Sequence, residues 1–135
     1  MVEVQINIWA VLLATVLHYI LGAFWYSPLL FGKLWLEMVG QSPEDLKKGA
    51  VKAYIGSFLA TLVMAYVMAH FVQYAGATTL LQGATAGFWA WLGFVATTSG
   101  INMLYQNKPW KLYLVDAGYF LAGLIIMGAV LGVWQ

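Results

Sequence analysis

Residues 112–134 have the sequence LYLVDAGYFLAGLIIMGAVLGVW, an apolar stretch that contains a single charged residue, Asp116. About 20 consecutive apolar residues are enough for a helix to cross the hydrocarbon core of a bilayer. Three more stretches of this kind come earlier in the chain, at about residues 6–26, 53–74 and 80–105. The sequence therefore predicts an all-α protein, a four-transmembrane-helix bundle that forms one domain over residues 1–135.

The composition supports a membrane protein and excludes several function classes. Hydrophobic residues make up 63% of the chain and charged residues 8%, whereas an average soluble domain has about 25% charged residues. The net charge of +1 provides no basic surface, so we expect no nucleic-acid partner. The absence of cysteine removes disulfides, thiolate metal sites and cysteine nucleophiles.

The lysines predict the orientation of the chain in the membrane. All six lie between the first and second stretches or between the third and fourth, at positions 33, 47, 48, 52, 108 and 111. By the positive-inside rule these two loops face the cytoplasm. We therefore expect a multi-pass protein of the bacterial cytoplasmic (inner) membrane, with both termini outside.

The first lysine-bearing loop is expected to contain helical structure. Residues 30–39 place apolar side chains on one face and charged ones on the other, which predicts a short amphipathic helix in the membrane interface. Ser42 and Pro43 then resemble the start of a helix, which we expect to continue without a break into the second span. Tyrosine, tryptophan and lysine near the interfaces predict anchors at Trp25, Tyr26, Trp35, Trp110 and Lys111.

Two ionisable residues lie inside predicted spans at similar depth. His18 is seven residues from Trp25, and Asp116 is five residues from Lys111, which places them about 10 Å and about 7 Å from the same interface. A candidate intramembrane polar site is therefore formed by His18, Asp116, Asn102, Ser57 and Tyr119, with His18 and Asp116 in contact directly or through one water. Such a pair could accept protons or bind a polar substrate. Alternatively, each group is satisfied locally and serves only helix packing.

Neither a metal site nor a cofactor site is predicted. Two histidines and one deep aspartate, without HxxxH or HExxH spacing, make a weak metal-binding set. The glycines at positions 83 and 87 lie inside an apolar span and have no following lysine, so helix packing explains them better than nucleotide binding. We expect no catalytic residues.

Two strings of sequence resemble a known family. Residues 22–33, GAFWYSPLLFGK, close the first span, and residues 109–119, PWKLYLVDAGY, open the fourth. With these strings the chain resembles domain of unknown function family 1761 over nearly its whole length. The resemblance implies a small four-helix integral membrane protein, chiefly bacterial, and no particular activity.

Three function classes remain, in decreasing order of preference. The first is a non-enzymatic membrane protein that works as an oligomeric transporter or proton-linked carrier of a small molecule. The second is a structural or interaction subunit of a membrane complex, and a membrane enzyme comes last because no nucleophile, metal set or acid pair is evident. The expected partners are the lipid bilayer, a further copy of the chain, and a small-molecule ligand or lipid whose identity is unknown. Small residues at four-residue spacing on the third and fourth spans favour the homo-oligomer.

Overall fold

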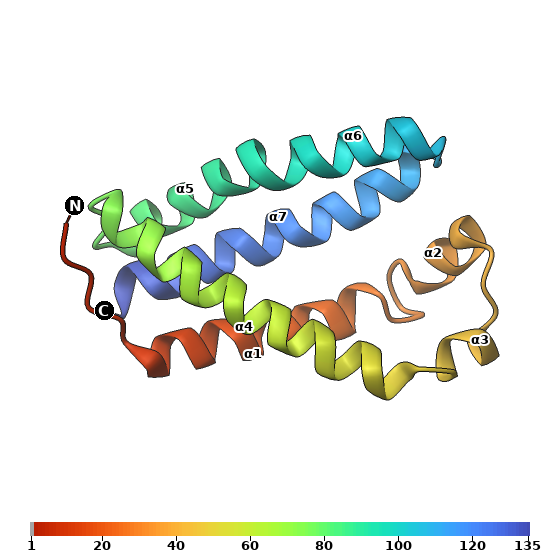
Figure 1. Ribbon diagram of the computed structural model, residues 1–135, viewed down its shortest axis with the longest axis horizontal. Helices are drawn as coiled ribbons and strands as arrows, with labels where there is room; N and C mark the ends of the chain where they lie inside the picture. Colours follow the sequence, from red (N-terminus) through yellow and green to blue (C-terminus); the bar gives the residue numbers. More distant parts are fainter. Residues whose placement is uncertain (1) are drawn as a thin grey trace.

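The computed structural model describes residues 2–135, which are mostly helical and contain no β-strand. Figure 1 shows α1 (Ile8–Trp25), α2 (Gly32–Val39), α3 (Pro43–Lys47), α4 (Ala50–Tyr74), α5 (Leu80–Ala90), the π-helical segment η1 (Trp91–Ala96), α6 (Thr97–Gln106) and α7 (Trp110–Val133). The all-α prediction is confirmed.

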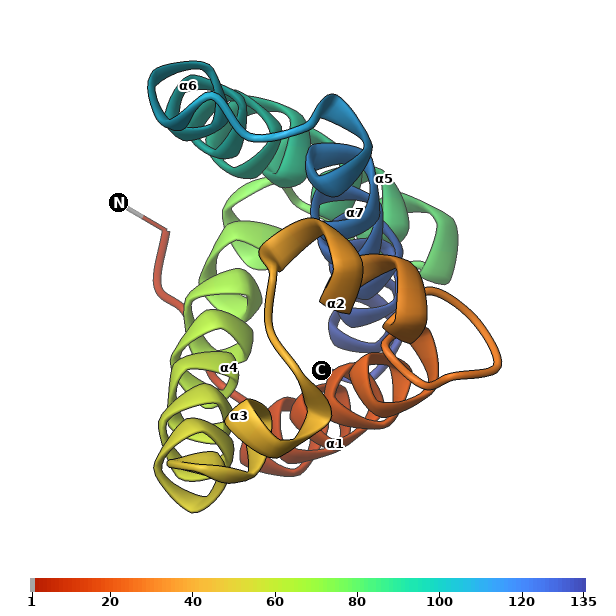
Figure 2. The ribbon, with the colours of Figure 1, turned by 90° about the vertical axis from the view of Figure 1, so that its right-hand side faces the viewer.

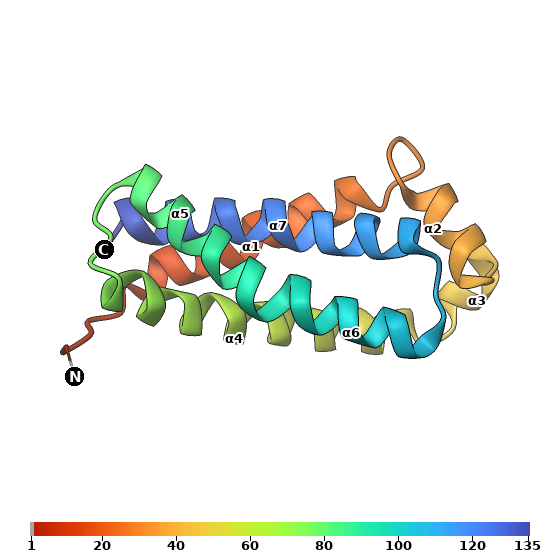
Figure 3. The same ribbon diagram turned by 90° about the horizontal axis from the view of Figure 1, so that it is seen from above.

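The helices run antiparallel, so the connections gather at two ends of the molecule. The start of α1, the end of α7 and the α4–α5 turn lie together at one end, which we call the terminal end (Figures 1 and 3). At the other end lie α2, α3, the start of α4, the α6–α7 turn and the start of α7, and this end of the molecule carries all six lysines. We call it the lysine end. The two lysine-bearing loops therefore share one end, as the sequence predicted.

Within residues 2–135, three helices are long and apolar enough to cross a membrane: α1, α4 and α7. The third predicted span, residues 80–105, is helical, but the π-helical segment η1 divides it into α5 and α6. The hydroxyls of Thr97 and Thr98, at the start of α6, donate to the carbonyls of Gly93 and Phe94 in η1, at 2.7 and 2.5 Å. Such bonds offer the backbone an alternative to the regular α-helical pattern. The structure thus gives three candidate spans and one interrupted helix, and the predicted number of four spans is not confirmed.

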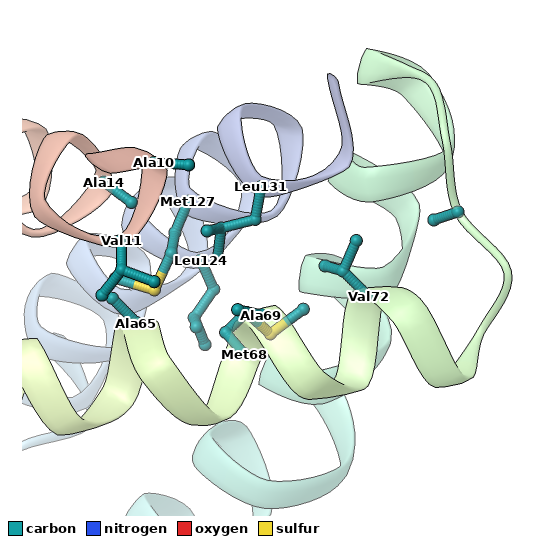
Figure 4. Close-up of a cluster of buried hydrophobic side chains, with 11 residues drawn as sticks. Ala10, Val11, Ala14, Ala65, Met68, Ala69, Val72, Leu124, Met127 and Leu131 are labelled. Carbon is teal, nitrogen blue, oxygen red and sulfur yellow. The ribbon is translucent and has the colours of Figure 1, made fainter. Parts of the chain in front are cut away.

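The terminal half of the bundle is closely packed. A Cβ atom on Gly83 of α5 would lie 2.0 Å from the carbonyl oxygen of Gly128 in α7, and one on Gly87 would lie 2.0 Å from that of Leu124. These two helices therefore touch backbone to backbone, as small residues allow in membrane proteins. A buried apolar cluster joins α1, α4 and α7 beside this contact (Figure 4); it includes Ala10, Val11, Ala14, Ala65, Met68, Ala69, Val72, Leu124, Met127 and Leu131.

The lysine half of the bundle is open. All residues from 51 to 60 in α4 are exposed, whereas Thr61, Ala65 and Met68 further along the same helix are buried. No residue of α6 is buried. Figure 2, which views the lysine end, shows α6 and α4 well apart, with α2 in front of α7. The interior of the protein is therefore complete only toward the terminal end.

The first lysine-bearing loop confirms one prediction and corrects another. The amphipathic helix predicted at residues 30–39 is α2. Ser42 caps α3, since its hydroxyl accepts from the Asp45 N–H and the Asp45 carboxylate accepts from the Ser42 N–H. The prediction that this helix continues into the second span is wrong, because Lys48 is extended and Gly49 adopts a left-handed φ of 73°. Glycine adopts the left-handed conformation readily, and this conformation at Gly49 separates α3 from α4.

Candidate polar site at the lysine end

The chain turns sharply after α1, and the turn directs two aromatic side chains toward α7. The Phe31 N–H donates to the Trp25 carbonyl and the Gly32 N–H to the Ser27 carbonyl, at 3.1 and 3.0 Å. A Cβ atom on Gly32 would lie 2.4 Å from the Tyr26 carbonyl oxygen. Only glycine therefore fits at this point of the turn, and the fold-back holds Trp25 and Tyr26 against the bundle.

Both aromatic residues bond to α7 at adjacent positions. The Trp25 indole N–H donates to the Val115 carbonyl at 3.0 Å, and the Tyr26 hydroxyl donates to Oδ1 of Asp116 at 2.6 Å. Gly118 leaves room for the Trp25 ring, which lies 3.3 Å from where a Cβ would stand. The segment 22–33 and the segment 109–119, far apart in sequence, thus form one contact.

The short helix α2 covers this contact. The Trp35 ring packs edge-on against the Tyr26 ring with centroids 5.9 Å apart, and it lies near the Asp116 carboxyl. Hydrogen bonds to a charged group are worth more than those between neutral groups. A half-buried carboxyl held by a tyrosine under an aromatic cover is therefore a specific structural feature of the lysine end.

A second bonded pair lies deeper in the bundle. The His18 side chain is 1% exposed, and its Nδ1 lies 2.7 Å from the Tyr119 hydroxyl oxygen. Two glycines make room for the pair: a Cβ atom on Gly123 would lie 2.5 Å from His18 Nε2, and one on Gly22 would lie 2.9 Å from the Tyr119 hydroxyl. The sequence therefore builds this site with small residues around two large polar side chains.

The hydrogen bonds select one tautomer of neutral His18. With the proton on Nδ1, His18 donates to the Tyr119 oxygen, and the Tyr119 hydroxyl donates to the His18 carbonyl at 3.3 Å. The other tautomer would bury an N–H at Nε2, which has no hydrogen-bond partner in residues 2–135. An unsatisfied buried donor costs about 1–3 kcal/mol. We therefore assign the proton to Nδ1, which leaves Nε2 as a buried lone pair.

The two pairs meet through their tyrosines. The rings of Tyr26 and Tyr119 pack edge-on, with centroids 5.4 Å apart. The hydrogen-bonding partner of His18 is therefore Tyr119 and that of Asp116 is Tyr26, so the direct His18–Asp116 contact is not formed. We call the four residues His18, Tyr119, Tyr26 and Asp116 the polar line. It extends from the lysine end of α7 to the edge of the apolar cluster.

Two of the predicted site residues lie elsewhere. Ser57 is exposed on α4, where its hydroxyl bonds to the Tyr19 hydroxyl at 3.0 Å. Asn102 is exposed on α6. At the depth of Ser57 and Asn102, α4 and α6 diverge from α1 and α7. The depth of a residue can be counted from the sequence, but the distance between two helices cannot.

The structure adds Tyr26 to the site, a residue that the sequence suggested as an interfacial anchor together with Trp25. Tyr26 follows Gly22 by four residues and His18 by eight, which places all three on one helix face. That spacing could have identified it. Trp110, by contrast, is 68% exposed beside the Lys111 ammonium, which lies 6.0 Å from its ring centroid, an arrangement suited to an anchor.

The site has hydroxyl, imidazole and carboxyl groups but lacks the donor set of a metal centre. Within residues 2–135 no three His, Cys, Asp or Glu side chains come together. The arrangement can hold, donate and accept protons.

Comparison with known proteins agrees with the two strings that form this site. The model of a family described as "Protein of unknown function (DUF1761)" matches residues 9–132. The chain belongs to this family. Searches of curated proteins and of solved structures found no match. Both strings lie within the matched region, and membership in DUF1761 leaves the activity to be inferred from the site.

Proposed function

We propose that the protein is a non-enzymatic carrier of a small molecule, coupled to protons, which spans the bacterial cytoplasmic membrane four times and works as a homo-oligomer. In this arrangement the interrupted helix α5–η1–α6 is the fourth span. The lysine end faces the cytoplasm, and both termini lie outside.

The polar line is the observation that carries this proposal. It begins with a half-buried carboxyl at the lysine end and finishes at a fully buried histidine. Ionisable side chains inside membrane spans are costly and often mark proton pathways. Tyrosine hydroxyls both donate and accept hydrogen bonds, so they can pass a proton between the two ionisable groups.

The shape of the bundle supports the same function. Beyond His18 the apolar cluster closes the terminal half, while α4 and α6 leave the lysine half open (Figures 2 and 4). A carrier needs a state that is closed on one side and open on the other.

A homo-oligomer is part of the proposal, on grounds that differ from the sequence argument. Gly83, Gly87 and Gly128 are used inside one chain, in the α5–α7 contact, so the small residues leave little surface for a partner. One surface that remains free for a partner is α6, which has no buried residue and presents the Asn102 amide. Amide side chains form hydrogen bonds between membrane helices.

A structural or interaction subunit is the second candidate, and one observation favours it. Two hollows of the described chain, residues 2–135, are lined by neither His18 nor Asp116; one lies at the terminal end around Asn7 and Gln73, and the other lies between α1 and α4. In a structural subunit the polar line would serve only to fix α1 and the turn after it onto α7.

Cysteine accessibility distinguishes the two candidates, because the natural chain contains no cysteine. Ala14 is 1% exposed within the closed half. In a carrier, an Ala14→Cys thiol should react with a membrane-impermeant reagent added outside, at a rate that depends on external pH. Asp116→Asn should abolish this pH dependence. An Ala75→Cys variant on the outer turn corrects for the pH dependence of the thiol itself.

The opposite result would support the structural subunit. If Ala14→Cys stays unreactive from both sides at every pH, while Ala75→Cys reacts from outside, the closed half does not open and the carrier proposal is wrong.

A further inference from the structure

The inward face of α4 is only partly covered in the lysine half. Tyr54, Phe58, Thr61 and Ala65 follow one another at spacings of three or four residues, so they share one face of the helix. Thr61 and Ala65 are 7% and 0% exposed, but Tyr54 and Phe58 are 65% and 37% exposed. A face that is buried at one end of the helix is therefore covered only in part at the other, where the Tyr19 ring packs edge-on against Phe58 with centroids 5.7 Å apart.

A hollow lies on this partly covered face. It is open, has a volume of about 320 Å³, and is lined by Tyr19, Tyr54, Ile55, Phe58 and Leu59. The polar groups beside it are already paired, because the Tyr19 hydroxyl lies 3.0 Å from both the Tyr54 carbonyl oxygen and the Ser57 hydroxyl. The hollow thus offers rings and aliphatic groups, which suit a hydrocarbon chain.

A positive charge stands at the end of the hollow that is nearer the lysine end. Lys52 precedes Ile55 by three residues and Leu59 by seven, so the three lie on one side of α4. The distance from Lys52 to Leu59 along the helix is about 10 Å. No acidic residue occurs in α4. A lysine in this position extends toward the phosphates of the membrane surface.

We infer that the hollow binds an anionic phospholipid, with an acyl chain along Tyr54, Ile55, Phe58 and Leu59 and the phosphate on Lys52. Basic residues beside membrane helices attract anionic lipid headgroups. This site rests on the membrane placement proposed above, and it is independent of transport.

The charge at the hollow favours a lipid over a second copy of the chain. Copies inserted in the same direction and joined through this face would be related by a two-fold axis along the membrane normal. Each Lys52 would then meet the Lys52 of the other copy at the same depth, and like charges repel. An anionic lipid instead neutralises the lysine.

Native mass spectrometry of the full chain in mild detergent tests the site. Phosphatidylglycerol and phosphatidylcholine with identical acyl chains are the probes, and inorganic phosphate is a third. We expect one tightly held phosphatidylglycerol, weaker binding of phosphatidylcholine, and no retained phosphate. Lys52→Gln should lower the preference for phosphatidylglycerol about fivefold, and Lys108→Gln, on the other lysine-bearing loop, should leave it unchanged.

A second pair of variants tests the hollow itself. Ile55→Trp places a larger side chain in the hollow and should reduce the binding of both lipids about tenfold or more, whereas Ile101→Trp on α6 should not. Ile55 and Ile101 are 58% and 54% exposed, so the two substitutions disturb folding to a similar degree. Equal binding of the two lipids, or binding that Lys52→Gln and Ile55→Trp leave intact, overturns the inference. So does a dimer without bound lipid that Ile55→Trp dissociates, because a second copy would then occupy the hollow.

Discussion

Replacing Gly83 with alanine should force α5 away from α7. The new Cβ would lie 2.0 Å from the Gly128 carbonyl oxygen, whereas an aliphatic carbon and a carbonyl oxygen lie about 3.3 Å apart in a close C–H···O contact. The helices must therefore separate locally by about 1.3 Å. Neither α5 nor α7 can relieve this contact by rotating a side chain, because the opposing atom belongs to the backbone. A Cβ atom on Gly128 would likewise lie 2.1 Å from the Gly83 carbonyl oxygen.

Two terms determine the size of the effect. Overpacking of a closely packed interior costs about 1–3 kcal/mol, and a contact with backbone should lie at the upper end. Alanine is also a better helix former than glycine, by about 1 kcal/mol. We therefore expect Gly83→Ala to lower the free energy of unfolding by about 1–2 kcal/mol.

Gly93→Ala is the matched control, because no atom of another helix lies within 4 Å of the position of its Cβ. Here only the gain in helix propensity remains, about 0.5–1 kcal/mol. The free energy of unfolding can be measured in mild detergent by titration with a denaturing detergent, followed by tryptophan fluorescence and circular dichroism. Equal stability of the two variants would refute the backbone contact between α5 and α7.

Three further predictions concern the polar line, the cap of α3 and the orientation of the chain. Tyr26→Phe removes the hydroxyl that donates to Asp116 and should cost about 1–3 kcal/mol of unfolding free energy; Tyr105→Phe, at an 88% exposed position, should cost nothing measurable in the same assay. The N–H and hydroxyl of Ser42 hold the pKa of Asp45 below its ordinary value. The cap therefore stabilises the fold fully when the pH is above the ordinary pKa of an aspartate, and this stabilisation is lost as the pH falls through the lower pKa of the folded state. Carboxyl carbon NMR should show this low pKa, and Ser42→Ala should raise it. Reporter fusions at Ala77 and Gln135 should report the outside, and fusions at Gly40 and Asn107 the cytoplasm; a cytoplasmic C-terminus would contradict the orientation.

The helices could be predicted from the sequence because their apolar stretches are long and their boundaries carry clear signals. Val11, Ala14 and His18 share one face of α1 by helical periodicity, and all three are buried. Gly49 was missed as a break because glycine adopts both helical and left-handed conformations, and only the surrounding chain selects one.

The candidate site could be predicted only in part. His18 and Tyr119 were expected in one cluster and are bonded to each other. Ser57 and Asn102 have suitable depth, but depth does not reveal that α4 and α6 diverge in the lysine half. The role of Tyr26 depends on the turn before Gly32, where the backbone folds back on itself. Such a turn results from tertiary contacts, which cannot be predicted from the spacing of apolar residues along the sequence.

The most direct test of the polar line is nitrogen NMR of the His18 imidazole in lipid nanodiscs, in a His70→Gln background that leaves a single histidine. The account predicts that Nδ1 carries the proton. Tyr119→Phe should shift the Nδ1 signal strongly, and Tyr26→Phe should shift it less, because Tyr26 reaches His18 only through the Tyr119 ring. A proton on Nε2, or His18 signals that neither substitution changes, would contradict the account.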